Sequence, residues 1–272
     1  MNSIQKQQIR VPSTDGAHTL AGVVYIPVGD PVGILQVVHG MTEYIGRYDR
    51  FMTEMAEAGW VVCGHDHLGH GQTADPSEWG YIAKKNGWDI LCRDAKAVGD
   101  AVRKDYGQTL PYVLMGHSMG SFLARIYISW YAKEIDGAII MGTSGSNPAL
   151  PASFPLVKSM IAFKGKRYRS ELVRNIAFGT YNKKFKPQKT KNDWLSSDEG
   201  VVETYNKDPR CTFIFTLQGF LDKWLAGRWG AKIDYIHGDD ALRQLVNRPD
   251  AMGFMPRAFD KSELFGFIRK WG

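Results

Sequence analysis

Cysteine is scarce in this chain of 272 residues, which limits how the fold can be held together. The three cysteines, Cys63, Cys92 and Cys211, are an odd number and lack the close spacing of a metal-binding motif. Two of them fall within segments that we expect to be core elements. The sequence therefore argues against a disulfide framework and favours a reducing compartment.

Long apolar runs are missing as well. No stretch approaches the roughly 18 consecutive apolar residues that can span a bilayer. The first residues contain no apolar run of the kind found in secretory signals. The composition, 44% hydrophobic and 23% charged, is that of an ordinary globular protein. These features predict a cytoplasmic protein with one α/β domain, or one such domain with a small insertion.

Acidic residues are nearly absent from one part of the chain. Between residues 158 and 191, Glu171 stands alone against 11 Lys and Arg residues, which more than accounts for the net charge of +6. The simplest interpretation is a solvated face. An alternative is attraction to an anionic lipid surface or an acidic substrate, because aromatic residues such as Phe163 and Tyr168 lie among the charges. No nucleic-acid-binding motif is present, so no nucleic-acid partner is expected.

Strand and helix patterns alternate through the first half of the chain. Residues 9–27 have the pattern of a hairpin. Apolar runs typical of strands buried on both faces follow at residues 33–38, 60–64, 112–115 and 137–141. Helical periodicity covers residues 47–58, 88–106 and the segment after residue 120. This alternation predicts an α/β fold with a mostly parallel sheet and right-handed crossovers.

The alternation stops near residue 145. From residue 144 to residue 231 the signals are mainly those of helices and loops, with prolines between them. A last strand is expected at residues 233–238 and a closing helix at residues 261–271. We therefore expect a helical cap, residues 144–231, inserted into a core formed by residues 1–143 and 232–272.

A Gly-x-Ser-x-Gly pattern at residues 116–120 lies where a predicted strand meets a predicted helix. Strand, sharp turn and helix form the context of a nucleophile elbow, in which Ser118 occupies a strained turn. Side chains at positions 116 and 120 would collide with the neighbouring strand and helix, so glycine is needed at both. The pattern predicts a nucleophilic Ser118; the alternative is an ordinary glycine-rich turn before a helix.

A nucleophilic serine needs a base that removes its proton and donors that hold the oxyanion formed on attack. The elbow offers the backbone N–H of Met119, the residue after the serine. The second donor is expected from the loop formed by His39, Gly40 and Met41, and the Met41 N–H is our candidate. His39 is also a candidate base, although a histidine that opens such a loop more often positions it.

Three spaced motifs carry a family resemblance. They are His-Gly-Met-Thr-Glu-Tyr at residues 39–44, Asp-His-Leu-Gly-His-Gly at residues 66–71 and Gly-His-Ser-Met-Gly at residues 116–120. Over about residues 10–240 the chain resembles the monoglyceride lipase-like and lysophospholipase-like α/β-hydrolases, also grouped as serine aminopeptidase-like. The resemblance implies an α/β-hydrolase fold and cofactor-free hydrolysis of glycerides, lysophospholipids or small acyl esters through an acyl-enzyme. It also implies that Ser118 is the nucleophile, with Met41 and Met119 as oxyanion donors.

The chain departs from this family where the acid and the histidine of the triad are expected. The acid position is divided between Asp239 and Asp240, and residues 241–272 contain no histidine. His237 is the one histidine beyond the predicted cap, so His237 with Asp240 is our candidate pair, because triads are defined by geometry and not by chain order. If His237 is only a strand-end residue, the chain is a catalytically impaired hydrolase-fold binding protein. A tail foreign to the family is a further alternative.

His65, His67 and His70 are spaced somewhat like the ligands of a metallo-hydrolase. The His-x-His-x-Asp-His ligand motif needs an aspartate where this chain has Gly69, and no later histidine ligands follow. The run also coincides with the second family motif. We therefore predict no metal site.

Overall fold

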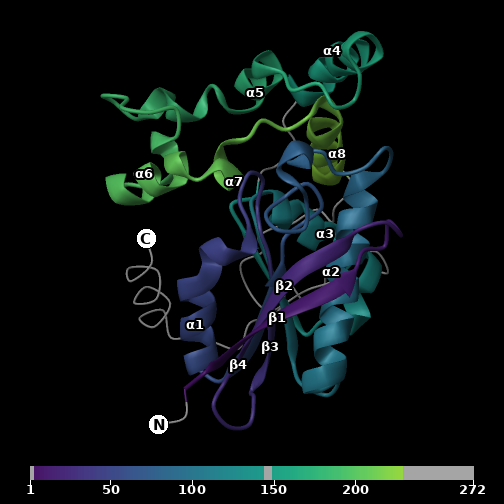
Figure 1. Ribbon diagram of the computed structural model, residues 1–272, viewed down its shortest axis with the longest axis vertical. Coiled ribbons are helices and arrows are strands. Elements are labelled where there is room, and N and C mark those ends of the chain that lie inside the picture. The colour runs from purple at the N-terminus through teal and green to yellow at the C-terminus, as the bar shows by residue number, and fades with distance from the viewer. Residues whose placement is uncertain (1–2, 144–148, 229–272) are drawn as a thin grey trace, which may run out of the picture. The chain divides into compact units, whose positions relative to one another are not determined.

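The protein is described by a computed structural model that covers residues 3–143 and 149–228. Its centre is a six-stranded sheet with the order β1-β2-β4-β3-β5-β6 (Figure 1). The strands are β1 Gln5–Pro12, β2 Thr19–Ile26, β3 Gly33–Val38, β4 Trp60–His65, β5 Tyr112–His117 and β6 Gly137–Met141. The four strands from β3 to β6 pair in parallel, and β1 and β2 join as an antiparallel hairpin at one edge. The predicted α/β fold with a mostly parallel sheet is confirmed.

Helices pack on both faces of this sheet. On one face, Met52 and Ala56 of α1 join the apolar side chains of β2, β3 and β4. On the other face, apolar residues of α2 and α3 pack against the opposite side chains of the same strands. These helices are α1 Asp49–Glu57, α2 Gly87–Tyr106 and α3 Met119–Tyr131. Their apolar stripes bury the two faces of the sheet, as the helical periodicity in the sequence predicts.

Helices also follow β6. They are α4 Ala149–Lys164, α5 Glu171–Phe178, α6 Glu199–Lys207, α7 Pro209–Thr212 and α8 Leu217–Arg228. We call residues 149–228 the helical segment. Its last helix, α8, packs against α2 and α3 beside the sheet and also against α4. The boundaries predicted for the cap and the core stay a prediction.

Two differences from the predicted elements have physical reasons. β1 begins at Gln5, four residues before the predicted strand, because Gln5 to Gln8 pair fully with β2 although their side chains are polar and exposed. An edge strand of this kind has no apolar pattern to detect. The helix predicted from residue 47 begins as a short 3₁₀ turn, Ile45–Tyr48, before α1.

Several predictions fall outside the described residues. The strand at residues 233–238, the closing helix at residues 261–271 and the second part of the core, residues 232–272, lie there. All three cysteines are described, and each is a buried free thiol. Among the helices described, none is long and apolar enough to cross a membrane.

Candidate active site

Ser118 occupies the sharp turn between β5 and α3. Its backbone angles are φ 53° and ψ −116°, a conformation that costs a non-glycine residue about 1–3 kcal/mol. The turn is held from both sides: the Ser118 N–H donates to the Met141 carbonyl on β6 at 2.9 Å, and the Ser118 carbonyl accepts the Ser121 N–H at 3.0 Å. Strand, strained turn and helix are all present, as the sequence pattern predicts.

The two glycines of the pattern are required by close packing. A Cβ at position 116 would overlap the backbone of Gly120 and lie 2.8 Å from the Ala124 side chain on α3. A Cβ at position 120 would overlap the Val38 carbonyl at the end of β3 and lie 2.7 Å from the His39 carbonyl. The predicted collisions with the neighbouring helix and strand are therefore real.

The loop after β3 lies against the serine. A Cβ on Gly40 would be 3.0 Å from the Cβ of Ser118. Met41 lines the same cavity as Ser118, whereas the Met119 side chain is buried. The loop and the start of α3 therefore both adjoin Ser118. The donor roles of the Met41 and Met119 N–H groups stay predictions.

His39 is fully buried and serves the loop. Its Nε2 accepts the His67 N–H at 3.0 Å, and its Nδ1 lies 2.8 Å from the Gly40 carbonyl oxygen. Burial lowers the pKa of His39 to about 3, so the ring is neutral near pH 7. Because backbone groups occupy both ring nitrogens, His39 is placed to position the loop and not to accept a proton from Ser118.

Glu43, a largely buried carboxylate next to the elbow, forms a network that the sequence pattern did not predict. Glu43 Oε1 accepts the Tyr48 hydroxyl at 2.9 Å and the Gly40 N–H, and it lies 3.1 Å from His117 Nδ1. Burial opposes its charge, but these hydrogen bonds, above all the one with His117, keep the pKa of Glu43 below its usual value. The network therefore ties His117, the residue before Ser118, to the loop after β3. Glu43 lies within the first family motif, which was the only signal available.

The described residues do not supply a base that could take the proton of the Ser118 hydroxyl. Among them, no side chain hydrogen-bonds to Ser118 Oγ. His117 directs Nδ1 at Glu43 and Tyr48. The predicted pair of His237 and Asp240 lies outside the residues described.

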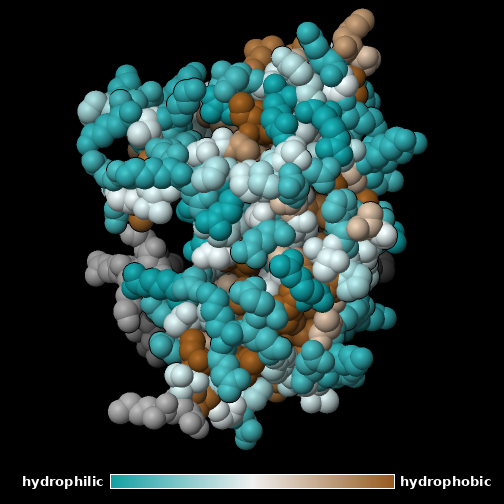
Figure 2. Space-filling model, in the orientation of Figure 1, coloured by the Kyte–Doolittle hydropathy of each residue, from teal (hydrophilic) through white to brown (hydrophobic). Residues whose placement is uncertain are grey.

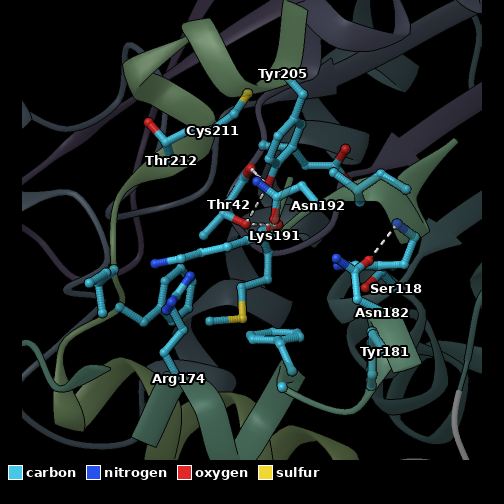
Figure 3. A pocket seen from close by; sticks show the side chains of 18 of the residues that line it. Thr42, Ser118, Arg174, Tyr181, Asn182, Lys191, Asn192, Tyr205, Cys211 and Thr212 are labelled. Carbon is cyan, nitrogen blue, oxygen red and sulfur yellow. Dashed lines mark hydrogen bonds between the residues drawn. The ribbon is translucent and has the colours of Figure 1, made fainter. Parts of the chain in front are cut away.

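Ser118 faces a cavity of about 1200 Å³ (Figure 3). Sites for small molecules usually measure roughly 300–1,000 Å³, so this cavity can hold an elongated ligand. Its apolar lining includes Phe122 of α3 and, from the helical segment, Phe213, Phe215 and Phe220. The cavity thus joins a strained serine to a wall suited to an acyl chain.

Hydrogen bonds tie the helical segment to the loop after β3 beside this cavity. The Tyr205 hydroxyl of α6 donates to the Thr42 carbonyl at 3.0 Å and lies 2.9 Å from Thr42 Oγ1, as Figure 3 shows. The Tyr44 hydroxyl donates to Asp208 at 2.9 Å. Thr42 itself has φ 52°, so the loop is sharply turned beneath this contact.

The histidines at positions 65, 67 and 70 are buried together with His39. Their ring centroids lie 4.0 to 6.0 Å apart in the pairs that touch. Burial lowers the pKa of all four imidazoles, so they pack as neutral rings. In the part of the chain that is described, no three metal-ligating side chains converge on one point.

Comparisons with known proteins agree with this geometry. The family model described as Serine aminopeptidase, S33 matches residues 29–230. Rat monoglyceride lipase is 27% identical over 183 residues, which are 67% of this chain and 54% of that enzyme. The monoacylglycerol lipase of Mycolicibacterium smegmatis is 27% identical over 210 residues, 73% of this chain and 66% of that enzyme. The chain thus spans between half and two thirds of the length of these relatives.

One solved structure is similar over most of the chain. It is a thermostable carboxyl esterase from Bacillus coagulans in complex with glycerol, with a TM-score of 0.76 and 30% sequence identity. The similarity covers 84% of this chain and 73% of the esterase. A lipase in an open form has the same fold, with a TM-score of 0.70 and 22% sequence identity. This similarity covers 84% of the present chain and 74% of the lipase chain.

Proposed function

Because this chain belongs to the serine aminopeptidase S33 family, we propose that it hydrolyses carboxylic esters with Ser118 as its nucleophile. The observation that carries the proposal is the strained Ser118, which opens into a large cavity with an apolar wall. The substrates that fit this wall are acyl esters, either lipid-like, such as monoacylglycerols and lysophospholipids, or small. The lipase and esterase relatives support this class of substrate.

The proposed mechanism has two halves. Ser118 Oγ attacks the ester carbonyl while a base takes its proton, and the N–H groups of Met41 and Met119 hold the oxyanion. The C–O bond breaks, the alcohol leaves with that proton, and an acyl-enzyme remains. Water then attacks the acyl-enzyme with help from the same base, which releases the acid and restores Ser118. His237, oriented by Asp240, is the proposed base.

The helical segment has a surface through which the protein could contact a lipid membrane that holds the substrate. Phe163 is 86% exposed, and Tyr168 and Leu172 are exposed nearby in the same basic stretch. Figure 2 shows apolar side chains among hydrophilic ones over this part of the molecule. Exposed apolar side chains beside lysines and arginines favour peripheral contact with an anionic lipid surface, where acyl esters are found.

A second candidate function is supported by a different observation. Because no described base reaches Ser118 Oγ, the chain would bind acyl esters without turning them over if residues 232–272 supply no base either. A catalytically impaired binding protein would keep the cavity and the elbow. Trace turnover would not distinguish the two candidates, since an oxyanion hole with binding alone supplies about 10³-fold catalysis.

Hydrolysis of p-nitrophenyl butyrate and 1-oleoylglycerol by the purified protein tests the proposal. We expect turnover of about 1 s⁻¹ or more, and a loss of at least a thousandfold in Ser118→Ala and in His237→Ala. His18→Gln, in the turn between β1 and β2, is the matched control and should keep the parental rate. A parent rate within tenfold of that of Ser118→Ala would eliminate the hydrolase and leave the binding protein.

A further inference from the structure

One lysine inside the cavity has no counterion in the described part of the chain. Lys223, on α8, lines the cavity into which Ser118 opens, and its side chain is only partly accessible. Its ammonium lies over the Phe178 ring, 4.4 Å from the ring centroid. No described carboxylate pairs with it, and burial lowers the pKa of Lys223 to about 8.

The neighbours of Lys223 hold α8 in one rotational position. Asp222 is buried and accepts the Gly87 N–H at the start of α2 at 3.1 Å. Trp224 is buried against Phe154 and Phe220, with ring centroids 5.7 and 6.0 Å away. Because both flanking side chains are anchored in the interior, α8 cannot turn Lys223 away from the cavity without breaking these contacts.

The cavity as a whole carries excess positive charge. The positively charged residues that line it are Arg47, Arg174, Lys183, Lys191 and Lys223. The negatively charged residues are Glu43 and Glu171. The two arginines are matched by the two acids, with distances of 3.7 Å from Arg47 to Glu43 and 2.7 Å from Arg174 to Glu171. The three lysines have no acidic partner among the residues described. Figure 3 shows Arg174 and Lys191 extending into the cavity.

An ammonium that is withdrawn from water and left unpaired is unfavourable. When such a group lies in a cleft, it is a candidate for a functional site, because a ligand can complete the charge balance there. Phe178 leaves the donors of the ammonium free, because a ring face contacts the charge but accepts no strong hydrogen bond. An oxyanion bound there would supply the missing counterion through charge-assisted hydrogen bonds, which are roughly twice as strong as those between neutral groups.

We propose that Lys223 binds a phosphate group of the substrate, so that the preferred esters are acyl chains with an anionic head group. The acyl chain would lie along the phenylalanine wall near Ser118, and the phosphate would meet Lys223, with Lys183 and Lys191 nearer the solvent. The catalytic part of this inference rests on the proposed ester hydrolysis. Lys223 determines specificity for the head group and takes no part in bond breaking.

Two esters that differ only in the phosphate test this proposal. The measured quantity is the ratio of kcat/KM for 1-oleoylglycerol 3-phosphate to kcat/KM for 1-oleoylglycerol. We expect this ratio to fall at least tenfold in Lys223→Met and to be largely retained in Lys223→Arg. Lys133→Met, an exposed lysine beyond α3, is the control and should keep the parental ratio. An unchanged ratio in Lys223→Met overturns the proposal.

A binding measurement separates this proposal from the proposed hydrolysis. Calorimetric titration of Ser118→Ala with decyl phosphate should give a Kd that rises at least tenfold when Lys223→Met is added, and that rises between pH 7 and pH 9 as Lys223 loses its proton. If no ester is hydrolysed but this dependence is found, the hydrolase proposal fails and the head-group site stands. If inorganic phosphate binds as tightly as decyl phosphate, the ligand is free phosphate and the substrate assignment is wrong.

Discussion

Ser118 shows how neighbouring residues set the chemistry of one side chain. Its positive φ places the hydroxyl at the exposed tip of the elbow, and only the packing around it makes that conformation stable. Gly116 and Gly120 allow the close approach of β3, β5 and α3. Glu43 contacts both His117, the residue before the serine, and the Gly40 N–H of the loop after β3.

The glycine at position 116 can be tested against another glycine in the same sheet. Gly116→Ala should lower the free energy of unfolding by roughly 1–3 kcal/mol, because its Cβ would overlap the Gly120 backbone. Gly137→Ala on β6 is the matched control, since its Cβ would have the Val113 side chain at 3.5 Å as its nearest neighbour. Urea unfolding measures both variants, and equal stabilities would contradict the packing argument.

At the scale of an element, α8 connects the helical segment to the helices beside the sheet. It packs against α2, α3 and α4, and Asp222 caps the first turn of α2 through the Gly87 N–H. Burial raises the pKa of Asp222 to about 7, because the charged carboxylate is less stable away from water. The element that carries Lys223 therefore has a stability that depends on pH.

The direction of this dependence follows from the raised pKa. The pKa of Asp222 is 3.8 in the unfolded chain and about 7 in the folded chain, so the folded state holds this proton more tightly. The contribution of the protonated carboxyl to the free energy of unfolding is therefore full below pH 3.8 and is lost as the pH rises through 7. Between pH 5 and pH 8, the parent should therefore lose on the order of 1–3 kcal/mol of unfolding free energy relative to Asp222→Asn. Thermal melts across this range measure the difference.

Asp105→Asn is the control for this prediction, because Asp105 is an exposed acid near the end of α2. The difference between the parent and this variant should stay constant from pH 5 to pH 8. If Asp222→Asn behaves in the same way as Asp105→Asn, the buried carboxyl does not titrate in this range.

At the scale of the whole molecule, the buried histidines make folding sensitive to acid. Burial lowers the pKa of His39 to about 3 and those of His65 and His70 to about 4, from 6.5. At these three histidines, the unfolded chain therefore binds more protons than the folded chain below pH 6.5. Stability should be lost as the pH falls from 6.5 towards 4, at about 1.4 kcal/mol per pH unit for each such histidine.

His65 allows this loss to be assigned. Neither of its ring nitrogens hydrogen-bonds to another described residue, so His65→Leu removes the titration without breaking a hydrogen bond. In urea unfolding of this variant, the free energy of unfolding should fall less steeply with decreasing pH, by about 1.4 kcal/mol per pH unit, which is the share of one histidine. His18→Gln is the control, because Asp15 raises the pKa of His18 and its effect has the opposite sign. An unchanged slope in His65→Leu would mean that His65 is not buried as a neutral ring.

The family and the α/β-hydrolase fold were predictable from short stretches of the chain. The three motifs predict both, and the family model, with the esterase structure, confirms them. The parallel strands were predictable because β3, β4 and β5 are buried runs with a continuous apolar pattern. The polar start of β1 was not, because hydrogen bonds to β2 place it in the sheet and its side chains carry no such pattern.

Most of the described elements and the turn at Ser118 follow from local sequence, because apolar periodicity and the glycines around Ser118 act over a few neighbouring residues. Which distant side chains share the site depends on how the elements pack together. Glu43 and His117 are 74 positions apart, and Lys223 reaches Phe178 from a separate helix. The excess charge in the cavity is likewise a property of the fold, because pairing removes some cations and leaves others. Burial and charge pairing depend on which surfaces meet, and local pattern does not encode that.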